Sequence, residues 1–312
     1  MVIYHSLKEL PEGRKYVLAL GFFDGCHRGH RKVFARAREM ASALSAEPGV
    51  LTFWPHPMTI LAPDIHVPLL QDRKEKEASF AEAGMALALF LTPDRAFLRK
   101  PAETFLKELK ALPGVAGVVT GENFTFGHGA LGNSAMLLDF FRNTPVKAEV
   151  VSLLSEEGET VSSTAIRQII GKGDMEEAAR LLGRPYTTSG DVVHGFHRGT
   201  DILGFPTANL SLPENHVCPP DGVYATVARI HGKRYPAITN IGTNPTFGNT
   251  EKTIETFIFH FDASIYGSPF TLEWIHRIRG EIRFPSPEAL KEQIKKDIRE
   301  AERVLGEERV ES

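Results

Sequence analysis

The sequence predicts an α/β protein in which a doubly wound parallel sheet is followed by a small antiparallel β-barrel and a C-terminal helix. Three observations favour this fold class. Short apolar runs alternate with helical stretches between residues 17 and 153, which is typical of a parallel sheet. From Tyr186 onward, short alternating segments are separated by Gly and Pro, as in a small barrel. Residues 286–305 then have helical composition and open with Ser-Pro.

Length and composition are those of an ordinary globular protein with two domains. The 312 residues are 42% hydrophobic and 24% charged, and a formal net charge of −3 does not suggest a nucleic-acid partner. Cys26 and Cys218 lie far apart and outside any CxxC pair, which argues against zinc or disulfides. The first residues lack the apolar core of a signal peptide, and no apolar run approaches the roughly 18 residues of a membrane span. We expect a cytoplasmic protein with no membrane partner, for which a weak homo-oligomer is an open alternative.

The first half of the chain reads as strands and helices in alternation. The apolar runs expected to form strands are 17–20, 50–53, 85–91, 115–120 and 147–153. The intervening stretches with helical composition are 32–37, 71–84, 102–112 and 133–141. Short spacing of this kind favours a doubly wound sheet, which binds ligands at the carboxyl ends of its strands.

The turn after the first of these strands has the composition of a phosphate site. It reads GFFDGCHRGH over residues 21–30 and leads into a helix. A helix N-terminus offers free N–H groups and a positive dipole end, and glycines let a ligand approach the backbone. Two His residues at this spacing can both donate hydrogen bonds to phosphate oxygens. A glycine-rich surface turn is the alternative, but the full pattern favours a nucleotide site made of Gly21, Phe22, Phe23, Asp24, Gly25, His27 and His30.

Two other segments of the first half carry possible ligand contacts. Pro55, His56 and Pro57 make a rigid loop at the end of the second predicted strand, where a plain strand terminator is the alternative to a ligand contact. Residues 162–167 read SSTAIR before an apolar run and can be a simple helix cap. Hydroxyls at a helix N-terminus with Arg167 one turn later also suit a triphosphate. Because a phosphate-type turn lies in the same sheet, we favour the clamp.

The pattern changes after the predicted helix at 174–182, which ends at Gly183. We place the domain boundary there, with one domain at 1–184 and the other at 185–312. Alternation of apolar and polar residues is clearest at 226–230 and 256–261, as expected for barrel strands.

A second group of polar residues lies in the barrel half. Thr207 and Asn209 in GFPTANL (204–210) would point the same way in an extended segment, and hard oxygen ligands suit Mg²⁺. An ordinary turn is the alternative. Glu255 lies in an apolar strand and could act as a general base, although an outward-facing strand Glu is the commoner case.

These motifs together resemble the bacterial bifunctional riboflavin kinase/FAD synthetase family over nearly the full length. In the first half the matching segments are GFFDGCHRGH at 21–30, GENFTFG at 121–127 and SSTAIR at 162–167. In the second half they are GFPTAN at 204–209, GVY at 222–224, NIG at 240–242, PTF at 245–247, Glu255, and Tyr-Gly at 266–267.

The resemblance implies two linked reactions, each consuming ATP. An N-terminal FMN adenylyltransferase domain of the HxGH nucleotidyltransferase type would have His27, His30 and Arg167 as catalytic residues. It would bind ATP also through Asn123, Ser163 and Thr164, and flavin through Pro55, His56 and Pro57. In a C-terminal riboflavin kinase domain, Glu255 would be the catalytic base and Thr207 and Asn209 would hold Mg²⁺. Its nucleotide would lie along Gly204, Pro206, Thr207 and Asn209.

Several positions depart from the family pattern and keep other functions open. The departures are Phe22, Trp54, Ala130, Asn133, Ala165 and a loop near Thr200 that is one residue longer and lacks an Arg. One alternative is an FMN adenylyltransferase whose barrel binds flavin with weak or no kinase activity. Another is a flavin-binding regulator. A third, a nucleotidyltransferase acting on a different substrate, explains the HxGH turn but not the GFPTAN barrel.

Overall fold

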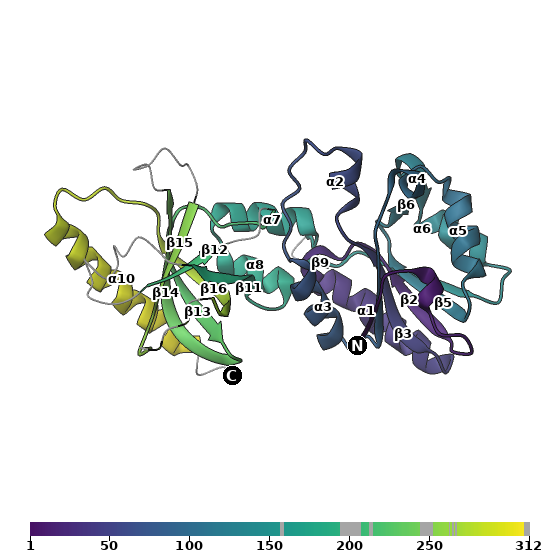
Figure 1. Cartoon of the computed structure of the whole chain (residues 1–312), viewed down its shortest axis with the longest axis horizontal. Coiled ribbons are helices and arrows are strands. Elements are labelled where there is room, and N and C mark those ends of the chain that lie inside the picture. The colour runs from purple at the N-terminus through teal and green to yellow at the C-terminus, as the bar shows by residue number, and fades with distance from the viewer. Residues whose placement is uncertain are drawn as a thin grey trace. The chain divides into compact units, whose positions relative to one another are not determined.

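The computed structural model divides the chain into two units, Met1–Ser163 and Thr164–Ser312, whose elements Figure 1 labels. The structure describes residues 1–156, 159–193, 207–211, 215–243, 252–261, 263, 265 and 267–308. The domain boundary predicted after Arg184 lies between helix α8 (Met175–Leu182) and strand β11 (Tyr186–Val193), and it stays a prediction.

The first unit is built on a six-stranded parallel sheet in the order β1-β4-β3-β2-β5-β8. Its strands are β1 (Val2–Tyr4), β2 (Tyr16–Leu20), β3 (Glu47–Phe53), β4 (Leu87–Leu91), β5 (Val115–Gly121) and β8 (Lys147–Val151). The five strands expected from the apolar runs are confirmed. Strand β1 was not predicted, because three residues are too few to show a period. The strand order reverses between β2 and β5, and ligands bind at such a switch point in open α/β sheets.

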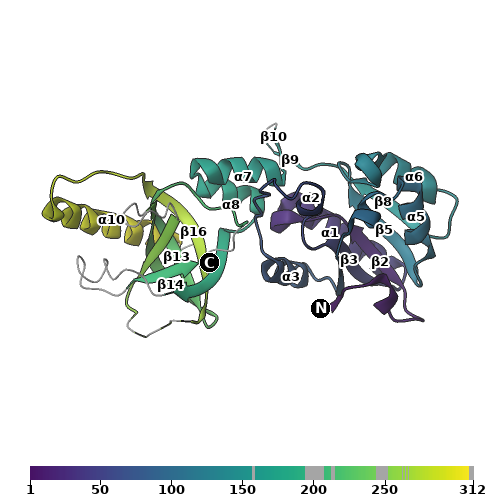
Figure 2. The same ribbon diagram turned by 45° about the horizontal axis from the view of Figure 1, so that its top comes forward.

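Helices cover both faces of this sheet, α1 (Arg28–Ala43) and α3 (Arg73–Glu82) on one side and α5 (Ala102–Ala111) and α6 (Ser134–Phe141) on the other, as Figures 1 and 2 show. The short helices α2 (Pro57–Leu61) and α4 (Arg95–Leu98) follow β3 and β4 and contain no buried residue. Two short hairpins complete the unit: β6 (Thr125–Phe126) with β7 (Gly132–Asn133), and β9 (Ser155–Glu156) with β10 (Glu159–Thr160).

Strand β2 lies in the middle of the core and is buried along its whole length. Its alternate side chains enter two different hydrophobic clusters: Leu18 packs with the α5 and α6 side, and Val17 packs with the α1 and α3 side. A strand buried on both faces requires a continuous apolar run, which explains why β2 is so evident in the sequence.

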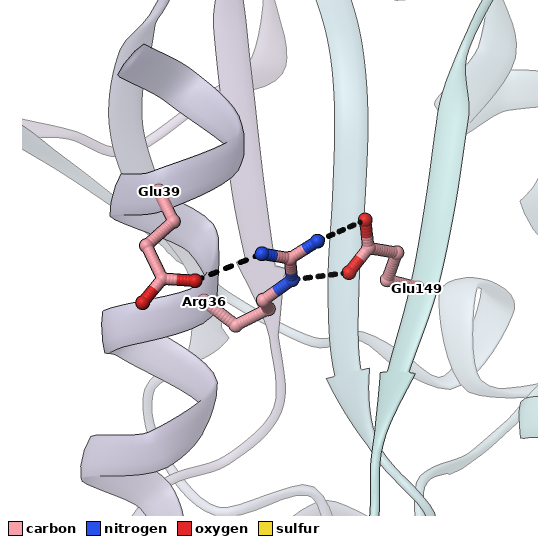
Figure 3. Close-up of polar contacts among 3 residues, drawn as sticks. All are labelled: Arg36, Glu39 and Glu149. Atoms are coloured by element: carbon pink, nitrogen blue, oxygen red, sulfur yellow. Dashed lines mark hydrogen bonds and ion pairs between the residues drawn. The ribbon is translucent and has the colours of Figure 1, made fainter. Parts of the chain in front are cut away.

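An exposed ion pair ties the edge strand β8 to α1. The Arg36 guanidinium makes two hydrogen bonds to the Glu149 carboxylate and a third, 2.8 Å long, to Glu39 on its own helix (Figure 3). Ion pairs exposed to this degree contribute little to stability. The hydrophobic clusters therefore hold the sheet and helices together.

The second unit contains a closed antiparallel barrel in the order β11-β12-β15-β14-β13-β16. Besides β11, its strands are β12 (Ala208–Ser211), β13 (Gly222–Ile230), β14 (Lys233–Thr243), β15 (Lys252–Ile258) and β16 (Pro269–Arg279). Helices α7 (Ser163–Lys172) and α8 precede the barrel, and α10 (Pro287–Glu308) follows it. The predicted barrel and closing helix are confirmed.

The barrel interior is mostly apolar, with Tyr224, Ile241 and Ile254 among its buried side chains, but it also contains a chain of three threonines. Thr226, Thr239 and Thr256 are fully buried, and their hydroxyls form a chain across β13, β14 and β15, with oxygen separations of 2.8 and 2.9 Å. Neighbouring residues of β13 face outward and pack against Ala301 and Leu305 of α10. Each buried hydroxyl thus has a partner, as burial of polar groups requires.

Candidate functional site

The turn after β2 has a strained backbone. Phe23 and Cys26 both have positive φ, 57° and 44°, which is unusual for residues other than glycine, and Gly25 has a φ of 81°. The ring of Phe23 folds back over Gly21, where an added Cβ would approach Phe23 Cζ to 2.8 Å. The absence of a side chain at Gly21 thus leaves room for the Phe23 ring, whereas the close approach of a ligand expected for this glycine stays a prediction.

His27 and His30 stand together at the N-terminus of α1. His27 is the N-cap residue, and its Nδ1 accepts a hydrogen bond from the backbone N–H of His30 at 3.3 Å. The two rings stack with centroids 3.5 Å apart and planes inclined by 21°. A Cβ on Gly29 would approach the His27 ring to 3.1 Å, so the glycine leaves room for this arrangement. The structure thus brings the two imidazoles together, and their donation to phosphate oxygens stays a prediction.

Burial makes both imidazoles poor bases. It lowers the pKa of His27 to about 4, although the nearby Asp24 carboxylate acts in the opposite direction. Burial also lowers the pKa of His30 well below its usual value, and the neighbouring His27 and Lys76 lower it further. Both rings are consequently neutral near pH 7.

The hydrogen-bond pattern assigns the proton of neutral His27. Because Nδ1 accepts from the His30 amide, the proton is on Nε2, where it can be donated to a ligand. His30 Nδ1 is buried and has no hydrogen-bond partner within the described part of the chain. A buried polar atom of this kind costs free energy unless something else satisfies it, so it marks a place for a ligand atom.

Asp24 and Ser163 hold the turn to its surroundings. Both Asp24 carboxylate oxygens lie 3.1 Å from the backbone N of Leu70, which donates to them. The Ser163 hydroxyl donates to the backbone carbonyl of Asp24 at 2.8 Å. The predicted phosphate-clamp residue Ser163 is thus attached to the HxGH turn. Thr164 and Arg167 follow on α7 in the second unit, and their contacts with nucleotide stay predictions.

The predicted flavin loop lies beside the same turn. His56 caps α2 by accepting from the Met58 amide at 3.1 Å, and its ring meets the edge of the Phe22 ring at a centroid distance of 4.3 Å. Asn123 is exposed just past the end of β5, the strand next to β2. These residues thus follow the carboxyl ends of three neighbouring strands, β3, β2 and β5, which Figure 1 labels, and the switch point lies between β2 and β5.

One residue of this region was missed by the sequence reasoning. Lys76 on α3 is fully buried, and its ammonium donates to the Phe22 carbonyl oxygen at 2.8 Å. Within its helix the only available signal was its place three and four residues before Ser79 and Phe80, both buried. That spacing puts it on the inner face but does not show that a lysine would be buried there.

The barrel half brings together a row of polar side chains on neighbouring strands. Asn209 of β12 pairs in register with Glu255 of β15, which pairs with Asn240 of β14. Cross-strand partners have Cβ atoms about 4.5–5.5 Å apart, so these side chains are neighbours. The sequence placed Asn240 in the NIG motif but did not place it beside Glu255, because register between strands is not visible in a local pattern.

Glu255 lies on the outer face of the barrel. It is half-buried, between the buried residues Ile254 and Thr256, so the commoner of the two orientations considered for it is the one observed. Glu255 is a candidate site residue because it lies beside Asn209. Asn209 is buried and lies two residues before the end of β12. Thr207 is half-buried immediately before β12, whereas the predicted Gly204 and Pro206 lie outside the described residues.

The oxygen donors of this row suit Mg²⁺. A hydroxyl, an amide oxygen and a carboxylate are hard ligands, and Mg²⁺ is commonly bound by one or two protein groups together with substrate phosphates. Thr207, Asn209 and Glu255 supply this set. The described part of the chain contains no group of three or more His, Cys, Asp or Glu side chains able to hold a metal. The residues thus fit a metal shared with a phosphate substrate.

Comparison with known proteins agrees with both halves. Residues 10–165 match the family model described as FAD synthetase, and residues 182–305 match the model described as riboflavin kinase. A Bacillus subtilis (strain 168) protein called bifunctional riboflavin kinase/FMN adenylyltransferase is 35% identical over 307 residues, covering 97% of this chain and 96% of the relative. This chain belongs to the bifunctional riboflavin kinase/FMN adenylyltransferase family.

Other members of the family, and one solved structure, are similar along the same length. The Escherichia coli (strain K12) relative of the same name is 34% identical over 305 residues, covering 97% of this chain and 96% of its own. A crystal structure titled macrolide-efflux protein, from Streptococcus pneumoniae, is 32% identical, with a TM-score of 0.85 over 96% of this chain and 97% of that one.

No helix in the described residues is long and apolar enough to cross a membrane.

Proposed function

We propose that this chain converts riboflavin to FMN and then FMN to FAD, with one ATP consumed in each step. The observation that supports the proposal is that each half has its own cluster of polar side chains: the stacked His27–His30 pair at the N-terminus of α1, and the Asn209–Glu255 pair of β12 and β15. Membership of the family supplies the two reaction types.

In the kinase step, Glu255 is the base. A carboxylate oxygen of Glu255 takes the proton of the ribityl 5′-hydroxyl as that oxygen forms a bond to the γ-phosphorus of ATP and the bond to ADP breaks. Thr207 and Asn209 would hold Mg²⁺ and the phosphates. When bound, the magnesium ion would offset negative charge on the phosphate oxygens.

In the adenylyl-transfer step, a phosphate oxygen of FMN attacks the α-phosphorus of the second ATP and pyrophosphate leaves. FMN supplies the attacking phosphate and ATP supplies the pyrophosphate leaving group. The protein therefore contributes positioning and charge stabilisation and no covalent nucleophile. His27 Nε2–H and the free amides of α1 donate to phosphate oxygens, and the unpartnered Nδ1 of His30 lies in the same place. Ser163, Thr164 and Arg167 would hold the β- and γ-phosphates.

The remaining assignments complete the nucleotide site. Asn123 would contact nucleotide or flavin past the end of β5, and Pro55, His56 and Pro57 would lie against FMN. The ring contact between His56 and Phe22 supports this, since it brings the flavin loop to the nucleotide turn. A cytoplasmic location belongs to the proposal on the basis of composition and cysteine usage.

Incubation of the full chain with riboflavin, ATP and Mg²⁺, followed by separation of the flavins, tests the proposal. We expect FMN and FAD to accumulate in turn, and excess EDTA to stop FMN formation. Production of FAD from added FMN without any FMN from riboflavin would instead support an adenylyltransferase with an inactive barrel. Absence of both products would support a flavin-binding protein.

A further inference from the structure

A lysine is buried against the turn that carries the histidine pair. The Lys76 ammonium donates to the Phe22 carbonyl at 2.8 Å and lies 3.4 Å from the centre of the Phe22 ring. The Trp54 ring centre is 5.6 Å away. Burial of an ammonium group is costly unless hydrogen bonds and favourable electrostatics compensate. Lys76 meets both conditions with the backbone and the ring of a single residue of the turn.

The Phe22 carbonyl oxygen is held in place by hydrogen bonds just before the strained turn. It accepts a second hydrogen bond from the Thr52 hydroxyl of β3 at 3.1 Å. Immediately after it, Phe23 and Cys26 adopt positive φ, a conformation that persists in residues other than glycine only where the surroundings enforce it. Two donors on one carbonyl, from α3 and β3, provide such enforcement.

The positions of the two histidines depend on this turn, because Cys26, the last residue of the turn with positive φ, is bonded directly to His27. A rotation of the Phe22 peptide would change where α1 begins and hence where the two imidazoles point. We propose that Lys76 is a positioning residue for adenylyl transfer: by holding the Phe22 carbonyl, it fixes the strained turn that presents His27 and His30. This inference rests on the proposed function of the first unit.

The positive charge of Lys76 also affects the pKa of His30. Burial, His27 and Lys76, in that order, lower the pKa of His30, and the Asp24 carboxylate acts on His27 in the opposite sense. Lys76 thus helps to keep His30 neutral before nucleotide binds. Replacing the ammonium with an uncharged group would raise the pKa of His30.

The test compares Lys76→Met and Lys76→Arg in the full chain, with Lys74→Met as the matched control. Lys74 is exposed on the same helix, two residues away. We expect Lys76→Met to lower kcat for FAD formation from FMN by about 10- to 100-fold, with riboflavin phosphorylation within about twofold of the wild type. Lys76→Arg should restore most of the rate, and Lys74→Met should behave as the wild type.

Two further readouts separate positioning from packing. In Lys76→Met, the acid limb of the pH profile for FAD formation should move to higher pH, whereas in Lys76→Arg it should stay in place. Thr52→Val removes the second donor to the same carbonyl and should also lower kcat. The double variant Lys76→Met/Thr52→Val should be no slower than Lys76→Met alone, because both changes act at one carbonyl.

The outcomes are distinguishable from failure of the proposed function. If the wild type makes no FAD from FMN, the proposed function is wrong; if the wild type and Lys76→Met make it equally fast, the Lys76 inference is wrong. The inference is also overturned if Lys76→Arg does not restore kcat for FAD formation and the acid limb of the pH profile is unmoved in Lys76→Met. Should circular dichroism show that Lys76→Met is unfolded, Lys76→Arg and Thr52→Val decide: a Thr52→Val enzyme with wild-type kcat would overturn the inference.

Discussion

The His30 backbone amide donates to Nδ1 of His27 while the two imidazole rings stack 3.5 Å apart. The contact makes His27 the cap of α1 and directs its remaining N–H away from the helix. One side chain therefore ends the strained turn and begins the helix, and in the proposed function it would also donate to phosphate. Replacing His27 and replacing His30 should therefore have different effects on the site.

His30→Ala should abolish most FAD formation. The change removes an imidazole at the helix N-terminus but leaves the His27 cap in place, so we expect kcat for FMN adenylylation to fall by about 100-fold or more. Phosphorylation of riboflavin, which takes place in the barrel, should continue at the wild-type rate. Separation of flavins after incubation with ATP and either riboflavin or FMN measures both. Unchanged FAD synthesis would contradict the phosphate role of the turn.

The first unit should lose stability as the pH falls below about 6.5. Above that value His27 is neutral in both folded and unfolded states. Below it the unfolded chain takes up a proton that the folded chain, with a His27 pKa of about 4, does not. Between pH 6.5 and pH 5 this amounts to 1.5 pH units, or about 2 kcal/mol from His27 alone.

Hydrogen exchange of the β2 amides at pH 7 and pH 5, corrected for intrinsic rates, measures this effect. His27→Asn is the matched variant, because asparagine can cap the helix but does not titrate. It should show a smaller loss of stability at pH 5 than the wild type, with His30 still contributing. An equal loss in both proteins would show that His27 is not responsible.

Glu255→Gln should stop the first reaction and spare the second. Glutamine keeps the size of the side chain and its place beside Asn209 but cannot accept the proton of the ribityl hydroxyl. We expect FMN formation to fall by about 10²- to 10⁴-fold, with FAD formation from supplied FMN unchanged. Glu292→Gln, at an exposed position on α10, serves as the control. A folded Glu255→Gln protein that has lost both activities would count against the assignment.

Thr239→Val should destabilise the barrel. Thr239 is the middle member of the hydroxyl chain with Thr226 and Thr256, so valine removes two hydrogen bonds and leaves buried partner groups less satisfied. The expected cost is about 1–3 kcal/mol in the free energy of unfolding. Hydrogen exchange of the β14 amides can detect it. Thr253→Val, at a half-buried position on β15, should cost less, and an equal cost at both positions would contradict the importance of the chain.

Local patterns account for the features that the sequence predicted correctly. The apolar runs of β2, β3 and β5 reveal a sheet buried on both faces, and the glycines and histidines of residues 21–30 reveal a turn and a helix start within ten residues. Each of these signals depends on neighbouring residues in the chain. The three-residue β1 carries no such signal.

The fold class, the HxGH turn and the candidate residues Thr207, Asn209 and Glu255 could be predicted from the sequence, since each is encoded in contiguous residues. Which residues surround them depends on how the chain folds. The register Asn209–Glu255–Asn240 depends on strand pairing between distant segments, and the burial of Lys76 beneath Phe22 depends on how α3 packs. Burial and neighbouring charge also set the pKa values of the histidine pair. These are properties of surroundings assembled from distant parts of the chain.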